Sequence, residues 1–232
     1  MLFPSTKTCK ILLAHIYFAR QSIPVNANWP EENLKIIRNL MEHAALYRRA
    51  LAPVAITVGV LGLAAAAFAQ AVGWTEPNRF AAFWMGVAGI SMLLALLLIR
   101  RQALKGGEEF WSPPTRRVAQ AMAPMLAAGL GLGLLELLRT PMERDGIRLA
   151  AIWMILYGGA LHSAGFFMQR GLRLFGWLFV VIGIICHGIL EFGETSWLVD
   201  TQSHWLMGWA FGINNLAYGL YLKLTAEPLE TE

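Results

Sequence analysis

Long stretches without any charged residue limit what this chain can fold into. Six of them follow one another between clusters of charge, at residues 50–75, 80–99, 118–135, 149–169, 174–190 and 201–222. Each is about as long as the roughly 17–25 residues that cross a bilayer as a helix. A soluble protein could bury one or two such helices, but this chain has too little amphipathic sequence to cover six. We therefore expect an all-α, polytopic transmembrane helical bundle with six spans, occupying residues 50–223.

The basic residues between these stretches predict how the spans are oriented. If the N-terminus is cytoplasmic, 15 of the 19 Lys and Arg residues fall in cytoplasmic segments and 4 in outer ones. Cytoplasmic loops of membrane proteins carry this excess of positive charge. We therefore expect both termini on the cytoplasmic side, and the excess of basic residues needs no nucleic acid to explain it.

The segment before the first span has the pattern of an amphipathic helix. Asn28 is a candidate cap, and Pro30 suits the first turn. Apolar residues recur at helical spacing at Leu34, Ile37, Met41 and Ala44. We expect residues 28–49, with Glu31 to Arg49 as the helix, to lie on the cytoplasmic membrane surface and contact lipid headgroups or a soluble protein partner.

The two ends of the chain are expected to add little structure. Residues 1–27 are predicted to be a poorly ordered leader, and residues 224–232 an acidic cytoplasmic tail. The apolar residues 11–19 after Lys7 and Lys10 also resemble a signal peptide. Cleavage after Ala27 would place Arg48 and Arg49 outside, however, against the charge rule.

Four protonatable residues are predicted at one membrane level on the outer side. His187 and Glu191 are four residues apart and share a helix face. The directions of the neighbouring spans place Glu136 and His204 at a similar depth. Imidazole and carboxylate groups could bind zinc or a related divalent metal, or relay protons. Alternatively, the carboxylates are solvated or paired with arginines of the 139–148 loop.

Three further polar residues are predicted inside spans, where each needs a partner. Asn215 shares a narrow helix face with Gly208, Gly212 and Gly219, which is typical of close helix packing, whereas Asn214 and Asn215 together could line a solute path. His162 is expected at a close helix contact. Haem held between His162 and His187 is disfavoured, because the two residues would lie roughly 20 Å and 6 Å below the outer helix ends at about 1.5 Å per residue.

The sequence lacks the common signatures of catalysis. It has no Walker loop, no nucleophile elbow, no HExxH pattern and no aromatic-rich basic surface for nucleic acid. Its two cysteines, Cys9 and Cys186, suggest neither a disulfide framework nor a thiolate metal cluster.

The segment Asn33-Leu34-Lys35-Ile36-Ile37-Arg38-Asn39-Leu40-Met41-Glu42, followed by Tyr47-Arg48-Arg49-Ala50 and Ala52-Pro53, resembles the opening of a family of uncharacterised bacterial inner-membrane proteins. Members of that family share an IR-x-LME element and a YR turn into the first span, although His43 stands where they commonly have Arg. The glycine-rich fourth span with Tyr157-Gly158 is also similar. The resemblance implies a multi-pass protein of the bacterial inner membrane and brings no catalytic residues with it.

Three function classes follow from these patterns. The leading hypothesis is a non-enzymatic, membrane-embedded binding or regulatory partner protein, with residues 31–49 as a contact for a cytoplasmic partner. The second is a small-solute or proton-coupled transporter that uses Asn214, Asn215 and the outer acidic residues. The third is a metal-dependent membrane enzyme, with Glu136, His187, Glu191 and His204 holding a divalent metal at the outer face.

Overall fold

The computed structural model describes residues 29–74, 76–107, 110–140, 142, 145–168, 170–192 and 202–225, with side-chain environments from Leu51 onward. The helices within these ranges are α2 (Trp29–Val72), α3 (Pro77–Gly106), α4 (Pro113–Leu138), α5 (Asp145–Ala164), α6 (Arg170–Phe192), α7 (Ser203–Met207), the π-helix η2 (Gly208–Ile213) and α8 (Asn214–Leu224). No strand occurs in the described part of the chain, so the prediction of an all-α protein is confirmed.

Five of these helices contain a segment that is long and apolar enough to cross a membrane. The segments are Leu51–Val72, Pro77–Lys105, Thr115–Leu138, Asp145–Ala164 and Arg170–Phe192. They coincide with the first five predicted spans. The chain therefore has the helices of a multi-pass membrane protein.

The sixth apolar stretch folds differently from a single α-helix. Residues 203–224 are helical throughout, but a six-residue π-helix separates α7 from α8. Neither α-helical part is long enough to span a membrane alone, which is why the stretch is not among the five.

The sequence analysis separates an amphipathic helix, residues 28–49, from the first span. In the structure both belong to one helix, because α2 runs without interruption from Trp29 to Val72. Contacts divide the chain into Met1–His43 and Ala44–Glu232. The expected leader, residues 1–27, and most of the expected tail lie outside the described residues.

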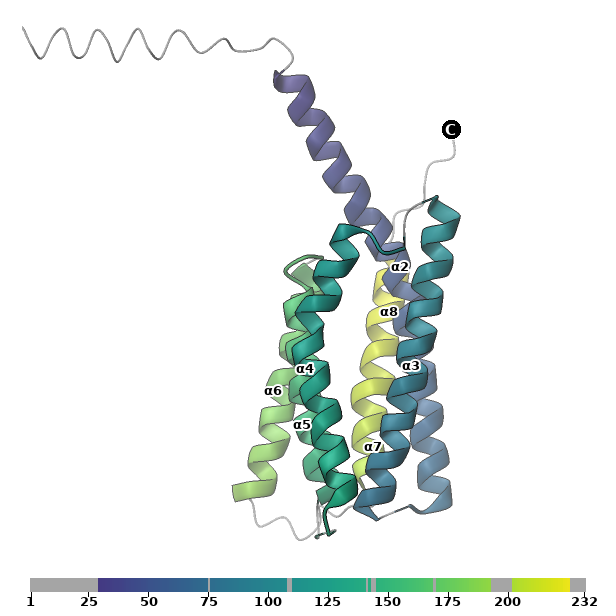
Figure 1. The fold of residues 1–232 in the computed structure, drawn as a ribbon, viewed down its shortest axis with the longest axis vertical. Coiled ribbons are helices and arrows are strands. Elements are labelled where there is room, and N and C mark those ends of the chain that lie inside the picture. The colour runs from purple at the N-terminus through teal and green to yellow at the C-terminus, as the bar shows by residue number, and fades with distance from the viewer. Residues whose placement is uncertain are drawn as a thin grey trace, which may run out of the picture. The chain divides into compact units, whose positions relative to one another are not determined.

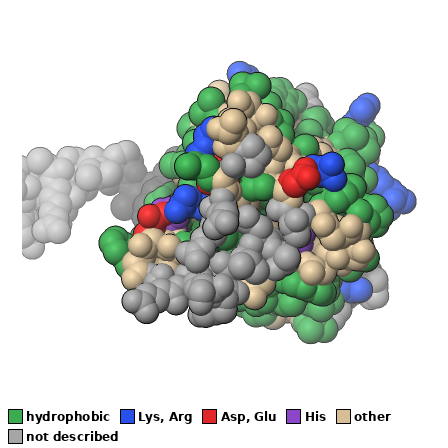
Figure 2. Space-filling model, turned by 90° about the horizontal axis from the view of Figure 1, so that it is seen from below, with side chains coloured by type: hydrophobic (Ala, Val, Ile, Leu, Met, Phe, Trp, Pro, Cys, Tyr) green, Lys and Arg blue, Asp and Glu red, His purple; other side chains and the backbone are tan. Residues whose placement is uncertain are grey.

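From Ala44 onward the helices run side by side as a bundle (Figure 1). Helix α5 is the most enclosed span, with 50% of its apolar segment buried, whereas only 6% of the α3 segment is buried. Leu93, Leu97 and Leu104 of α3 are all exposed. Exposed apolar side chains suit contact with lipid. Hydrophobic side chains also lie around the lower end of the bundle in Figure 2.

Glycines bring two antiparallel helix pairs into backbone contact. In the first pair, a Cβ atom added at Gly176 of α6 would lie 2.6 Å from the carbonyl oxygen of Gly158 in α5. In the second, a Cβ atom at Gly59 of α2 would lie 2.5 Å from the backbone nitrogen of Leu216 in α8. Gly212 and Gly219 contact α2 in the same way. Such close approach is a main source of helix association in membranes, where lipid removes the hydrophobic driving force.

The α5–α6 contact predicts that one methyl group added at Gly176 lowers the stability of the protein. The Gly176→Ala variant should unfold more easily by about 1–3 kcal/mol, because the methyl group meets backbone atoms that cannot move without separating the helices. Gly86→Ala is the matched control, since nothing lies within 4 Å of a Cβ atom at Gly86. Thermal unfolding in detergent measures both variants, and equal midpoints would contradict the packing account.

Candidate functional site

The four residues predicted to form an outer cluster all lie towards the lower end of the bundle in Figure 1, where α4 and α6 finish and α5 and α7 begin. Glu136 is in the last turn of α4, and Glu191 is in the last turn of α6, one turn beyond His187. His204 is in the first turn of α7. The local environments of these residues differ.

A chain of ion pairs joins α4, α5 and α6 at this end. Asp145, whose side chain is only 3% exposed, accepts hydrogen bonds from Nη2 of Arg139 to both carboxylate oxygens, at 3.0 and 3.3 Å. Arg148 Nη1 lies 3.7 Å from Asp145 Oδ1, and Arg148 Nε lies 2.9 Å from Glu191 Oε1. We call Arg139, Asp145, Arg148 and Glu191 the ion network. Glu191 is thus paired with Arg148, one of the residues 139–148 named in the alternative to a metal site, although Arg148 lies in the first turn of α5 and not in a loop.

Asp145 also organises the start of α5. The backbone N–H of Met142 donates a 2.8 Å hydrogen bond to Asp145 Oδ2, as the acidic member of a capping box does. A carboxylate in the first turn also interacts favourably with the positive end of the helix. The ion network therefore fixes where α5 begins as well as how it meets its neighbours.

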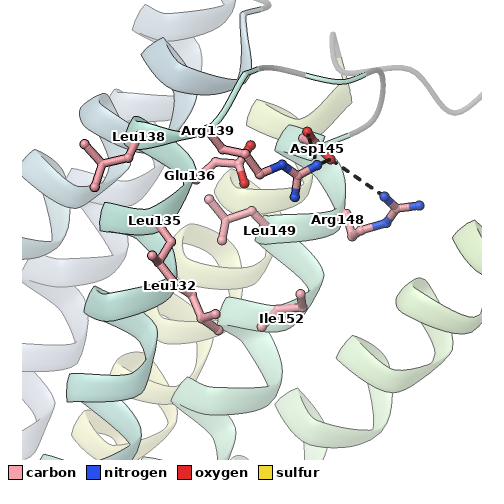
Figure 3. A pocket seen from close by; sticks show the side chains of 9 residues that line it. All are labelled: Leu132, Leu135, Glu136, Leu138, Arg139, Asp145, Arg148, Leu149 and Ile152. Atoms are coloured by element: carbon pink, nitrogen blue, oxygen red, sulfur yellow. Dashed lines mark hydrogen bonds and ion pairs between the residues drawn. The ribbon is translucent and has the colours of Figure 1, made fainter.

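An open pocket of about 500 Å³ lies between α4 and α5, and three members of the ion network, Arg139, Asp145 and Arg148, line it (Figure 3). Apolar side chains form most of its wall, namely Leu132, Leu135, Leu138, Leu149 and Ile152. The charged groups that line it are Glu136, Arg139, Asp145 and Arg148. Figure 3 shows Glu136 directed from α4 towards α5, beside Arg139. A pocket with apolar walls and a few charged groups at one end suits an amphipathic ligand.

His204 is held by two hydrogen bonds inside an aromatic cluster. The indole N–H of Trp84 donates to His204 Nδ1 at 3.0 Å, and His204 Nε2 lies 2.6 Å from the carbonyl oxygen of Trp74. Because an indole nitrogen only donates, Nδ1 must be the acceptor, and Nε2 carries the proton that it donates to Trp74. The rings of Phe80 and Phe83 also contact this imidazole. Both nitrogens of His204 thus link α7 to α3 and the turn before it, and neither is available as a ligand.

The predicted metal set is not gathered into a binding group. Within the described ranges, no three His, Cys, Asp or Glu side chains are placed so that they could hold a metal ion. His187 Nδ1 is buried and makes no hydrogen bond to the described residues. Glu191 and His204 have the partners given above, and Glu136 lines the pocket.

Asn215, one of the polar residues expected inside the spans, is engaged in contacts between helices. Asn215 is buried; its Oδ1 accepts a 3.2 Å hydrogen bond from the Tyr157 hydroxyl, and its Nδ2 donates to the carbonyl oxygen of Phe211 at 3.0 Å. This amide connects α8 with α5 and with the π-helix. Asn214, the adjacent residue, is half-buried.

His162 occupies the closely packed end of the α5–α6 hairpin. Its Nδ1 lies 3.4 Å from the carbonyl oxygen of Arg173, and its ring contacts Trp177. A Cβ atom added at Gly176 would lie 2.6 Å from the backbone nitrogen of His162. These contacts are those of a residue that holds two helices together.

Two residues of this region were missed by reasoning from the sequence. Asp145 had a detectable signal, since it lies six residues after Arg139 and three before Arg148 at the start of an apolar stretch. Trp84 had none, because it is 120 residues from His204 in the sequence. A contact of that separation depends on how the helices pack.

The ion network predicts two coupling energies of different size. A double-mutant cycle with Arg139→Gln and Asp145→Asn should give about 1.5–3 kcal/mol, because the carboxylate is buried and hydrogen-bonded to a charged group. The cycle with Arg148→Gln and Glu191→Gln should give about 1 kcal/mol or less, because both side chains are well exposed. Unfolding free energies of the single and double variants measure both values, and a reversed order would contradict the geometry.

No protein-family model matches this chain, and no curated protein and no solved structure was found to be similar to it. Membership of the bacterial inner-membrane family that residues 33–53 resemble therefore stays a prediction. The function has to follow from the ion network, the pocket and the helix contacts themselves.

Proposed function

We propose that this chain is a six-span membrane protein that acts by binding, as a membrane-embedded binding or regulatory protein, and that its ligand site is the pocket between α4 and α5. We further propose that it resides in a bacterial inner membrane with both termini in the cytoplasm. The observation that carries the binding proposal is the combination of apolar walls with charged residues at one end of a 500 Å³ pocket.

The sixth span in this proposal is the continuous helical stretch of residues 203–224. At about 1.5 Å per residue it is roughly 33 Å long, close to the roughly 30 Å thickness of the hydrocarbon core. Gly208, Gly212 and Gly219 pack against α2 along its length. Its one buried amide, Asn215, is hydrogen-bonded within the bundle. These contacts support a membrane-embedded helix despite the π segment.

The distribution of charge supports the proposed orientation. Arg100, Arg101 and Lys105 near the end of α3, with Arg116 and Arg117 at the start of α4, lie at the opposite end of the bundle from the ion network. The positive-inside rule makes that basic end cytoplasmic. The pocket then opens near the outer surface, and residues 31–49 lead into the first span from the cytoplasm, where they could bind lipid headgroups or a protein partner.

Binding has more support than the other two classes. A solute path through Asn215 would have to break the hydrogen bonds to Tyr157 and Phe211 that connect α8 with α5. A metal-dependent reaction would have to recruit ligands that the described residues do not place together. Binding in the pocket requires neither change.

The orientation predicts the outcome of topology mapping in bacterial cells. Reporter fusions after Gly107 and after Lys223 should be active only as cytoplasmic reporters, whereas fusions after Thr140 should be active only as outer ones. Five spans would place the end of the chain outside. An outer location for the Lys223 fusion would therefore overturn the six-span proposal.

The pocket predicts saturable binding of an uncharged, long-chain probe. A photoactivatable fatty amide in vesicles should label the peptides that carry Leu132–Leu138 and Leu149–Ile152, and excess unlabelled fatty amide should compete with this labelling. Leu135→Trp, which adds bulk to the pocket wall, should reduce the labelling, whereas Leu97→Trp on the exposed face of α3 should leave it unchanged. Labelling of the pocket that is no more saturable than that of α3 would refute a binding site.

A further inference from the structure

We infer that the pocket between α4 and α5 holds a glycerophospholipid of the surrounding bilayer, with an acyl chain against the apolar wall and the phosphate at Arg139 and Arg148. This inference rests on the proposed function, because it names the ligand of the same site.

The pocket has an apolar part and a charged part at different depths. From Leu138 to Leu132 the α4 side of the wall descends by about 9 Å at about 1.5 Å per residue, and its leucines are exposed to the outside of the bundle. The facing wall on α5 descends from Asp145 through Leu149 to Ile152. In a bilayer this gradient follows the change from headgroups to acyl chains, so a lipid fits the pocket in its ordinary orientation.

Arg139 keeps donors for an anion. It contacts Asp145 through Nη2 alone, so Nη1 and Nε are not used by that carboxylate. Arg148 faces Asp145 through Nη1 and Glu191 through Nε, which leaves Nη2 unused by these two carboxylates. The side chains of Arg139 and Arg148 are 50% and 38% exposed, whereas that of Asp145 is 3% exposed. An anion at the mouth therefore meets the two guanidinium groups and the exposed Glu191, with Asp145 enclosed behind them. Arginine offers several donors in a planar arrangement that matches phosphate oxygens.

The interior of the pocket suits an uncharged chain, and its mouth suits an anion. Leucines of α4 and α5 line the interior, whereas Arg139 and Arg148 lie at the mouth. Glu136 is largely buried, lies about one turn of α4 before Arg139 and makes a contact of its own. Glu191 is paired with Arg148 from the α6 side.

The experiment compares two lipids that differ only in the phosphate-bearing headgroup. The full-length protein is incorporated into nanodiscs with equal amounts of palmitoyl-oleoyl phosphatidylethanolamine and palmitoyl-oleoyl glycerol. The protein is then released from the nanodiscs, and native mass spectrometry measures how much of each lipid stays bound to it. Wild-type protein should retain the phospholipid about tenfold over the diacylglycerol, the ratio expected for one charge-assisted hydrogen bond.

Three variants identify the source of this preference. Arg139→Gln should lower it several-fold, and Arg139→Lys, which keeps the charge, should lower it less. Arg79→Gln is the matched control, because Arg79 lies at the same end of the bundle but is exposed and paired with Glu76. It should leave the preference unchanged. Thermal unfolding of each variant in lipid-free detergent verifies that it is folded, and a Leu135→Trp protein should retain less of both lipids.

The outcomes separate the inference from the proposed function. Equal retention of the two lipids by wild-type protein would overturn the assignment of the phosphate to Arg139 and Arg148, while saturable labelling by the fatty amide would still support a binding pocket. Equal loss of preference in Arg79→Gln and Arg139→Gln would also overturn it, since the effect would then come from general surface charge. Failure of both retention and saturable labelling would overturn the proposed function itself.

Discussion

A polar group enclosed by apolar helices must find its partner within the protein, because hydrocarbon supplies none. Three polar side chains of the described bundle meet this requirement through residues of other helices, whereas His187 Nδ1 is buried without a hydrogen bond to the described residues. His204 is bound by Trp84 and by the Trp74 carbonyl, Asn215 by Tyr157, and Asp145 by two arginines. Each partnership also sets the position of one helix against another. The polar side chains are therefore determinants of the helix arrangement and are not isolated features of single spans.

Close backbone packing makes these partnerships geometrically available. At Gly158 and Gly176 the helices α5 and α6 approach so closely that no side chain fits between them. The second glycine-mediated pair joins α2 to the helix that carries Asn215. The hydrogen bond between Tyr157 and Asn215 then adds a polar link between the two pairs, because it connects α5 of the first pair with α8 of the second.

The spans could be predicted from the sequence because their signal is local. A stretch such as residues 80–99 contains no charge, and its length alone fits a membrane helix. The π-helix at Gly208–Ile213 had no comparable signal, since its apolar and glycine residues suit an ordinary span equally well. Its presence depends on the contacts that α7 and α8 make with other helices. The sixth apolar stretch was therefore expected as one uniform helix, whereas residues 203–224 have a π-helix at their centre.

The sequence indicated at which end of the bundle the candidate-site residues lie, but it did not indicate which residues they contact. Charge and helix direction indicated that Glu136, Glu191 and His204 lie near one end of the bundle. They could not indicate that Trp84 would bind His204, because that contact joins helices distant in sequence. The arginines of the 139–148 loop were foreseen as partners for acidic residues, but Asp145, the most deeply buried of the acids they contact, was overlooked.

In the proposed complex, the position of these arginines would couple the stability of the bundle to the occupant of the pocket. Arg139 and Arg148 both hold Asp145 at the start of α5 and line the pocket beside it. A ligand that contacts their remaining donors would keep the same side chains in the rotamers that the ion network needs. It would bind the folded bundle and not the unfolded chain, so it would raise the unfolding free energy by an amount that grows with the logarithm of its concentration. Binding at the mouth and the anchoring of α5 are thus two effects of the same guanidinium groups.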